Sequence, residues 1–160
     1  MNPKYVIDRI NVEDLEEALR LVWKEFLTFE APDYSDEGVR EFKQFIDYGA
    51  IKQKLADNQL RMWVCKNKGK IIGTLAARPP CHISLLFVDQ EHHNKGIARA
   101  MLHAMTSYYK SVNTTGEITV NSSPYATEAY HRLGFIDTGP EQVVNGIRFI
   151  PMKRPLEESG

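Results

Sequence analysis

The segment 85–102 constrains the fold of this chain most, because an apolar strand runs through a short polar loop directly into an amphipathic helix. The loop holds one glycine, Gly96, and apolar residues then recur at helical spacing: Ile97, Ala98, Met101, Leu102 and Met105. The first turn of a helix has unpaired backbone N–H groups and a partial positive charge. Since Gly96 and Ala98 leave this backbone uncovered, the junction predicts a site for an anion such as a diphosphate.

The same junction resembles the coenzyme A loop of the GCN5-related N-acetyltransferases (GNAT family). In that loop an Arg or Gln is followed by x-x-Gly-x-Gly/Ala, and this chain reads His93-Asn94-Lys95-Gly96-Ile97-Ala98. His93 stands where the family usually has Arg or Gln, so the resemblance implies backbone contacts rather than that side-chain contact. The alternative is a helix that opens on a glycine and binds nothing.

A second stretch, residues 120–135, resembles the later motif of the same family. It reads as a strand ending in Asn121, a small polar residue, and a helix with the pattern Ala-x-x-x-Tyr-x-x-x-Gly-Phe, which ends on Gly134 and Phe135. Ser123 is a plausible helix cap with Pro124 at the first helical position. The two motifs lie in register, one helix and one strand apart, so together they imply an N-acetyltransferase.

The order of predicted elements gives the fold class. Alternation and helical periodicity indicate a strand, two helices, three strands, a helix, a strand, a helix and two final strands, with a hairpin signal at Asn145-Gly146. We expect an α/β fold with a mixed, largely antiparallel sheet and flanking helices. One strand–helix–strand crossover, from Val88 to Ile118, pairs its two strands in parallel. Gly73 inside the third strand predicts a bulge or a close backbone approach.

Length, cysteines and charge set the broad class. A chain of 160 residues predicts one domain, which we place at residues 1–154, followed by a flexible tail at 155–160. Cys65 and Cys81 form no disulfide framework, and the first residues show no apolar signal region, so we expect a cytoplasmic protein. No apolar run is long enough to span a membrane, and a net charge of −1 does not favour nucleic acid.

The resemblance implies a set of residues that bind acetyl-CoA between two diverging strands. In the family, the pantetheine pairs with the strand that carries Leu86, Phe87 and Val88. The diphosphate meets the backbone amides of the loop and the first helical turn: His93, Asn94, Lys95, Gly96, Ile97, Ala98 and Arg99. The side chains of Lys95 and Arg99 could add charge outside the loop or be merely solvated. Asn121 and Ser123 match positions that hold the pantetheine or the nucleotide end.

Two residues are candidates for catalysis. In the resemblance, Tyr130 lies near the thioester sulfur and gives a proton to the departing thiolate; the alternative is a core aromatic. Because a phenol has a pKa near 10 and a thiol has a pKa near 8.5, full proton transfer from Tyr130 to the thiolate is uphill by about 2 kcal/mol. This favours a hydrogen bond that strengthens as negative charge develops on the sulfur. His82 falls where histone-directed relatives carry a glutamate base, and histidine titrates in the useful range. It could instead only satisfy a strand end.

The acceptor is expected to be a primary amine, on a small molecule or a peptide. Between residues 30 and 47 six acids face two bases, a balance of −4, which indicates either a solvated helix face or an acceptor side that favours a cationic amine: Glu30, Asp33, Asp36, Glu37, Glu41 and Asp47 against Arg40 and Lys43. No metal site is predicted, and transfer is expected to be direct, without an acetyl-cysteine. A homodimer through the final strands is a further expectation. The competing function is a non-catalytic module that binds acyl-CoA or a partner.

Overall fold

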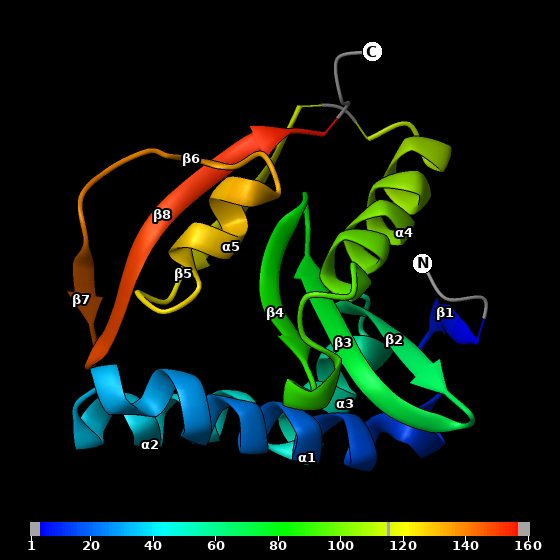
Figure 1. The fold of residues 1–160 in the computed structure, drawn as a ribbon, viewed down its shortest axis with the longest axis horizontal. Coiled ribbons are helices and arrows are strands. Elements are labelled where there is room, and N and C mark those ends of the chain that lie inside the picture. The colour runs from blue at the N-terminus through cyan, green and yellow to red at the C-terminus, as the bar shows by residue number, and fades with distance from the viewer. Residues whose placement is uncertain (1–3, 115, 157–160) are drawn as a thin grey trace.

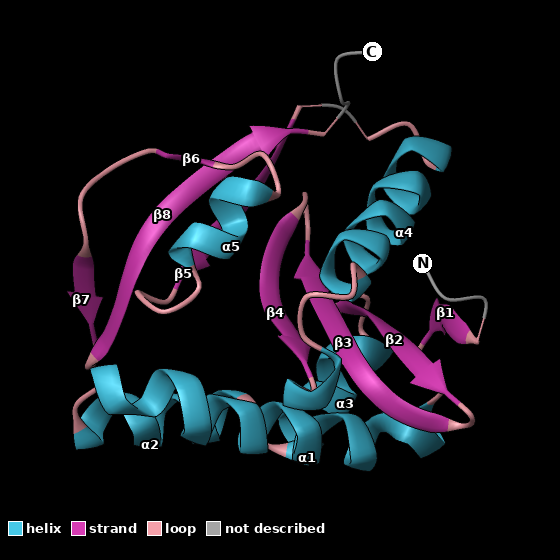
Figure 2. Ribbon diagram, in the orientation of Figure 1, coloured by secondary structure: helices cyan, strands magenta, loops and turns pink. Residues whose placement is uncertain are grey.

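The computed structural model describes residues 4–114 and 116–156, which form an open eight-stranded sheet with helices on both faces (Figures 1 and 2). In spatial order the strands are β1 (Tyr5–Arg9), β2 (Arg61–Asn67), β3 (Lys70–Arg78), β4 (His82–Val88), β5 (Glu117–Ser122), β8 (Ile147–Pro155) and β6 (Ile136–Asp137), while β7 (Gln142–Val144) pairs with β8. The α-helices are α1 (Leu15–Glu25), α2 (Asp36–Phe45), α3 (Tyr48–Ala56), α4 (Ile97–Ser111) and α5 (Thr127–Arg132).

The expected fold class is confirmed. Among the described residues the neighbouring strands are antiparallel except β4 and β5, which flank the predicted crossover helix α4 and run in parallel. The strand β4 is central, with β3 on one side and β5 on the other. This is the arrangement expected when a strand is apolar towards its end and a helix returns the chain to the same sheet.

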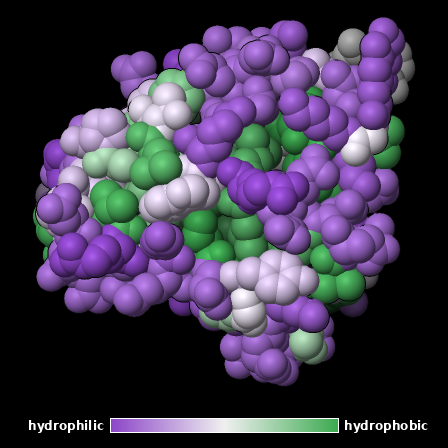
Figure 3. Space-filling view, turned by 90° about the horizontal axis from the view of Figure 1, so that it is seen from below, coloured by the Kyte–Doolittle hydropathy of each residue, from purple (hydrophilic) through white to green (hydrophobic). Residues whose placement is uncertain are grey.

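Two apolar cores, one on each face, hold the sheet. On one face α4 and α5 bury residues such as Met101 and Tyr130, and on the other α1 and α2 bury Phe26 and Phe42, whose rings stack with centroids 4.0 Å apart. Figure 1 shows α1 and α2 running beneath the sheet. Seen from that side in Figure 3, apolar residues gather in a hollow in the middle of the face, and hydrophilic residues surround it.

Gly73 shows the predicted bulge, and side chains of α4 rather than another backbone approach it closely. The register of β2 and β3 shifts beside it, since Cys65 opposes Gly73 whereas Lys66 opposes Ile71. A Cβ on Gly73 would stand 3.0 Å from the Met101 methyl group. The glycine therefore lets α4 pack closely against the sheet.

Short helices and chain ends differ from the sequence expectation. The helix α3 was not predicted, because only Ile51 of its nine residues is buried and its apolar pattern is weak. The helix α5 begins at Thr127 rather than at Pro124, although Ser123 accepts a hydrogen bond from the Ala126 N–H. Three short 3₁₀ helices and one π-helix also occur in the described chain: η1 (Val12–Asp14), η2 (Phe26–Glu30, the π-helix), η3 (Ala31–Asp33) and η4 (Gln90–His92).

The boundary placed at residue 155 needs correction. Strand β8 continues through Pro155, and Leu156 is buried with its N–H donating to the Gly116 carbonyl. Its apolar side chain fills the α4 face of the core, which is why the chain stays ordered there. The rest of the predicted tail, residues 157–160, lies outside the described residues, and the assignment of the chain to a single domain stays a prediction.

The N-terminus of α2 touches the β7–β8 turn through two glycines. Ser35 caps α2 by accepting a hydrogen bond from the Gly38 N–H at 3.2 Å. Gly146, in the left-handed region with φ 80°, lies directly against Gly38. A Cβ on Gly38 would overlap the Gly146 carbonyl oxygen. This contact joins the final hairpin to the helical layer.

Replacing Gly38 with alanine is expected to destabilise the protein by about 1–3 kcal/mol, because overlap with the Gly146 backbone outweighs the gain in helix propensity of about 1 kcal/mol. Urea unfolding measures the change. Gly49→Ala in α3 is the matched control, since its Cβ would meet only the Asp47 carboxylate at 3.4 Å. Equal stability of the two variants would contradict the contact.

Candidate active site

The cavity arises because β4 and β5 pair over only two positions. His82 opposes Thr119 and Ile83 opposes Val120, and beyond these the strands diverge. The opening is a cavity of about 530 Å³. It is lined by strand β4, the loop and start of α4, the helix α5 and the end of α1: Leu86, Phe87, Val88, His93, Asn94, Gly96, Ile97, Ala98, Arg99, Tyr125, Ala126, Ala129, Tyr130, Arg132, Leu133, Glu25, Phe29, Glu30 and His92.

A bulge in β4 re-aims the strand where it borders this cavity. Ala77 opposes Ile83 whereas Ala76 opposes Leu85, so that Ser84 is the extra residue. As a result Ile83 and Leu86 face the α4 core, and Leu85 faces the α1 core. The bulge thus turns the end of β4 relative to its start, at the point where β5 leaves it.

The predicted anion loop has the geometry that its sequence requires. Asn94 has φ 61° and Gly96 has φ 79°, and Gly96 directly precedes α4. Among the described residues nothing lies within 4 Å of the position that a Gly96 Cβ would take. The first amides of a fifteen-residue helix therefore open onto the cavity without a side chain in front of them.

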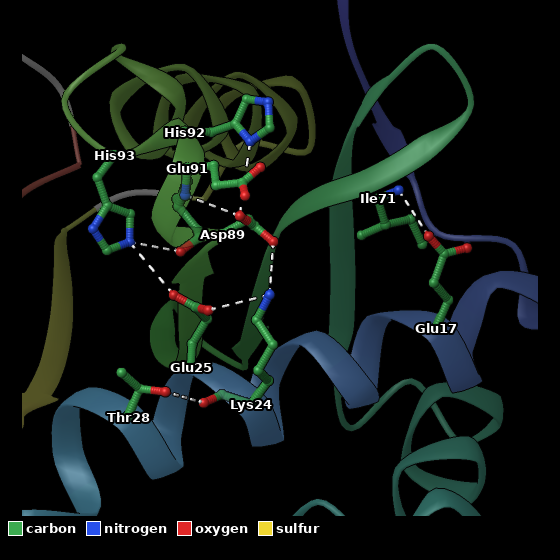
Figure 4. A network of polar contacts seen from close by, with 10 residues as sticks. Glu17, Lys24, Glu25, Thr28, Ile71, Asp89, Glu91, His92 and His93 are labelled. Atoms are coloured by element: carbon green, nitrogen blue, oxygen red, sulfur yellow. Dashed lines mark hydrogen bonds and ion pairs between the residues drawn. The ribbon is translucent and has the colours of Figure 1, made fainter.

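An ion pair between the exposed Lys24 and the buried Asp89 ties this loop to α1 (Figure 4). The Lys24 Nζ donates to the Asp89 Oδ2 at 3.0 Å, and the Glu91 N–H donates to the Asp89 Oδ1 at 3.0 Å. Burial acts to raise the pKa of Asp89, but these two hydrogen bonds outweigh it, so that the pKa lies below its usual value of 3.8. Asp89 is 5% exposed. It therefore holds the start of the loop as a carboxylate.

Glu25 lies beside the loop on the cavity side (Figure 4). It is 3% exposed, and its Oε1 lies 3.6 Å from the His93 Nε2. Within the described chain this oxygen has no hydrogen-bond partner. Burial raises the pKa of Glu25, although Lys24 opposes the rise. The His93 Nε2 donates to the Val88 carbonyl at 2.7 Å, so this side chain turns back onto β4.

Tyr130 lies on α5 and lines the same cavity as the loop. Its side chain is 7% exposed and meets Phe135 edge to face, with ring centroids 5.3 Å apart. Burial, followed by the negative charge of Glu30, raises the pKa of the Tyr130 phenol far above 10. The phenol is therefore a neutral hydrogen-bond donor at every physiological pH.

Glu30 enters the cavity from the end of the π-helix η2. Burial raises the pKa of its carboxyl to about 7, while a side-chain hydrogen bond with Ser123 acts in the opposite direction. Successive turns of a π-helix are bonded five residues apart, which places Glu30 one turn beyond Glu25 on the cavity side. This carboxyl and the Tyr130 phenol therefore lie in one enclosed space.

The structure does not bring His82 to this cavity. His82 lies at the start of β4, and its Nδ1 shares a hydrogen bond of 2.8 Å with the Thr119 Oγ1. Burial and then the Arg78 charge lower the pKa of His82 to about 4, so its ring is neutral and weakly basic at pH 7.

Cys81 is buried, and burial raises the pKa of its thiol to about 11. A protonated thiol outside the cavity is a poor nucleophile.

Most of the other predicted site residues do come together. All three β4 residues line the cavity, and so do the loop and helix residues except Lys95, which is exposed. The Arg99 guanidinium donates to the Arg132 carbonyl at 2.8 Å and so joins α4 to α5. Asn121 is exposed opposite Pro151 on β8 and does not line the cavity. Ser123 is buried, and its side chain hydrogen-bonds to Glu30, which lines the cavity.

Sequence reasoning missed the residues that α1 and η2 contribute. Glu25, Phe29 and Glu30 face the cavity, yet only Glu30 drew attention, as one acid of a negative stretch. The sequence did contain one signal of a site: Glu25 is an acid on the face of α1 whose other buried residues are apolar. Phe29 also stacks on Tyr125, with ring centroids 5.0 Å apart.

Metal-binding clusters and membrane-spanning helices are both absent from the described residues. No group of three or more His, Cys, Asp or Glu side chains in residues 4–114 and 116–156 has the arrangement of a metal site. Within the same part of the chain, none of the helices is both long and apolar enough to cross a membrane.

Sequence comparison assigns the family. The family model described as an acetyltransferase (GNAT) domain matches residues 30–156, so this chain belongs to the GNAT acetyltransferase family. The chain is also 31% identical, over 102 residues, to the uncharacterized N-acetyltransferase YafP of Escherichia coli (strain K12). The match covers 64% of this chain and 61% of that relative, so the chain spans less than two thirds of the relative's length.

Solved structures share the fold. A GCN5-related N-acetyltransferase from Rhodopseudomonas palustris superposes with a TM-score of 0.79 at 17% identity and covers 94% of both chains. The PaiA N-acetyltransferase of Thermoplasma acidophilum, solved with coenzyme A, gives 0.76 at 15% identity and covers 94% of this chain and 98% of its own. At these identities the likeness establishes the fold alone.

Replacing Asp89 with asparagine is expected to destabilise the protein by about 1–3 kcal/mol at pH 7, because Lys24 loses a buried charged partner. The pKa of Asp89 is depressed, so its contribution is present above pH 3.8 and is lost as the pH falls through the folded-state pKa. Urea unfolding at pH 7 and at acidic pH measures this. The exposed Asp57→Asn is the control, and an unchanged midpoint for Asp89→Asn would contradict the ion pair's role.

Proposed function

We propose that this protein is an acetyl-CoA-dependent N-acetyltransferase that transfers the acetyl group directly to a primary amine. One observation carries the proposal: a helix N-terminus with uncovered amides and the Tyr130 phenol line the same cavity, between two strands that part. The first feature suits a diphosphate and the second suits a thiolate leaving group. The family membership supports the same reaction class.

Acetyl-CoA would be held by the backbone more than by charged side chains. The amides that follow Gly96 face open space, which suits direct contact with the diphosphate. The apolar side chains of β4 supply a wall for the pantetheine arm: Leu86, Phe87 and Val88. The Val88 carbonyl already accepts a hydrogen bond from His93, so a ligand that pairs with this carbonyl replaces the imidazole. The thioester itself supplies the activated acyl group.

Tyr130 acts in this proposal as a hydrogen-bond donor to the departing sulfur. The pKa of the Tyr130 phenol is raised above 10, whereas a free thiol has a pKa near 8.5. Full proton transfer from this phenol to the thiolate is therefore even less favourable than transfer from a free phenol. A hydrogen bond that strengthens as negative charge develops still lowers the barrier. The buried, protonated Cys81 supports a reaction without an acetyl-enzyme.

The decisive experiment combines binding and turnover. Calorimetry with coenzyme A tests the loop, and a panel of primary amines with acetyl-CoA, read by thiol release, tests transfer. We expect saturable binding of coenzyme A and release of thiol that depends on the amine. Absence of cofactor binding in the folded protein would contradict the proposal.

Replacing Ala98 with glutamate is expected to lower the affinity for coenzyme A by at least about tenfold, because a carboxylate would occupy the cavity beside the diphosphate-binding amides. Calorimetry measures the change. The control is Ser107→Glu, which adds the same charge at an exposed position of the same helix. Equal affinities for the two variants would place the diphosphate elsewhere.

Replacing Tyr130 with phenylalanine is expected to lower kcat by about 100-fold, in the range for loss of a general acid, while the affinity for coenzyme A stays unchanged. Thiol release and calorimetry separate the two effects. The phenyl ring of the variant would keep the edge-to-face packing on Phe135, so folding is preserved. A variant with the wild-type rate would favour the alternative, a module that binds acyl-CoA without using this phenol.

Three expectations stay predictions. Cytoplasmic location and a homodimer rest on the sequence and on the family resemblance, and so does the choice of a primary amine as acceptor. The surface that a dimer would bury includes exposed apolar residues of β6 and β7: Ile136, Val143 and Val144.

A further inference from the structure

We propose that Glu30 is the general base of the transfer and that the acceptor is a cationic amine held against its carboxylate. This inference rests on the proposed function and names the residue and substrate class that the function leaves open. Glu30 lines the cavity together with Tyr130, and the two side chains come from different elements, η2 and α5. A base and a donor to the leaving group in one cavity are what direct acyl transfer requires.

The charges that line the cavity are divided between its walls. The two arginines, Arg99 and Arg132, come from α4 and α5, and they are joined by the hydrogen bond of Arg99 to the Arg132 carbonyl. Both carboxylates, Glu25 and Glu30, come from the continuous α1–η2 segment. This division gives phosphates a positive wall and leaves the opposite wall to a positively charged acceptor.

Aromatic rings beside Glu30 fit the same substrate class. Phe29, its neighbour in η2, stacks on Tyr125, and both rings line the cavity. The faces of aromatic rings attract cations, and a partly enclosed site strengthens that attraction. The alkyl part of an amine would pack on these rings while its ammonium group meets the carboxylate.

The surroundings of Glu30 set its proton affinity. Asp33 of η3 is a nearby negative charge, the Ser123 hydroxyl hydrogen-bonds the carboxyl, and the phenols of Tyr34, Tyr125 and Tyr130 all lie within its electrostatic reach. Other charges on the surrounding elements are those of Glu25 on α1 and of Arg148 on β8, which acts on Tyr34. With a pKa of about 7, Glu30 is ionised in about half of the molecules at neutral pH, which suits a base.

The step balances without any further reactant. One proton of the bound ammonium moves to a Glu30 carboxylate oxygen, and the lone pair that is freed attacks the thioester carbonyl carbon. The C–S bond breaks as the C–N bond is completed, and the sulfur leaves with the electron pair. The second amine proton reaches the thiolate, which the Tyr130 hydroxyl hydrogen-bonds, and Glu30 releases its proton to solvent. The products are the amide, the free thiol and one proton.

The kinetic test uses Glu30→Gln and two amines of similar shape. Ethylamine is protonated at neutral pH and needs a base, whereas trifluoroethylamine is largely neutral already. We expect wild-type kcat/KM for ethylamine to rise to a plateau above pH 7. In Glu30→Gln it should be about 100-fold lower at pH 7 and should rise without a plateau, in proportion to the neutral amine. For trifluoroethylamine the variant should be within about threefold of the wild type. Glu16→Gln, an exposed change on the preceding helix α1, is the control and should match the wild type.

A second readout needs no turnover. Since the pKa of Glu30 is raised by folding, ionisation of this carboxyl opposes folding as the pH rises through 7. Glu30→Gln should therefore raise the Tm at pH 8 more than at pH 5, whereas Glu16→Gln should not. Carbon-13 NMR of the labelled carboxyl should show Glu30 titrating near 7.

The outcomes separate the two proposals. A plateau above pH 7 that survives in Glu30→Gln, equal losses for both amines, or a Glu30 carboxyl that titrates near 4.5 would each overturn the role of Glu30. Failure of the wild type to bind coenzyme A or to release thiol with any amine would instead refute the proposed function. In that case the carboxyl titration still decides whether Glu30 has the proton affinity that a base requires.

Discussion

The short parallel pairing of β4 and β5 is the constraint on which the site depends. Two paired positions fix the strands at one end, and the bulge at Ser84 helps to turn β4 away beyond them. Backbone groups that lose a neighbouring strand need other partners. His93 supplies one at the Val88 carbonyl, and the remaining exposed backbone and apolar side chains form a cleft wall. The sheet thus creates a binding site by failing to close.

The end of α1 matters because it brings negative charge into a largely apolar cavity. A regular α-helix would turn the residue five places beyond Glu25 well away from it, but the π-helical turn of η2 keeps both acids on the cavity side. Lys24 and Asp89 fix the same stretch of α1 to the loop before α4. The segment that carries the acids and the loop before α4 are therefore positioned by one ion pair.

Sequence reasoning found the features that depend on local pattern. The strand, the loop and the helix around Gly96 and the fold class follow from periodicity and short motifs, and the cavity position of Tyr130 follows from the family resemblance. It did not reach features that depend on long-range geometry. His82 lies where the strands still pair, and Glu30 faces the cavity only because a π-helix changes the helical register. Side-chain direction at a bulge or a π-turn has no signature that a single sequence reveals.

The contact between Gly38 and Gly146 has a consequence for the outer strands. It joins main chain to main chain, and beside it the Arg148 guanidinium of β8 donates to the Asp33 carbonyl at 3.0 Å. Neither contact uses the side chains of Val143 and Val144, which are 61% and 54% exposed on β7. Evolution or an engineer can rewrite that edge, for solubility, labelling or a new partner, while the hairpin keeps its place against the helices.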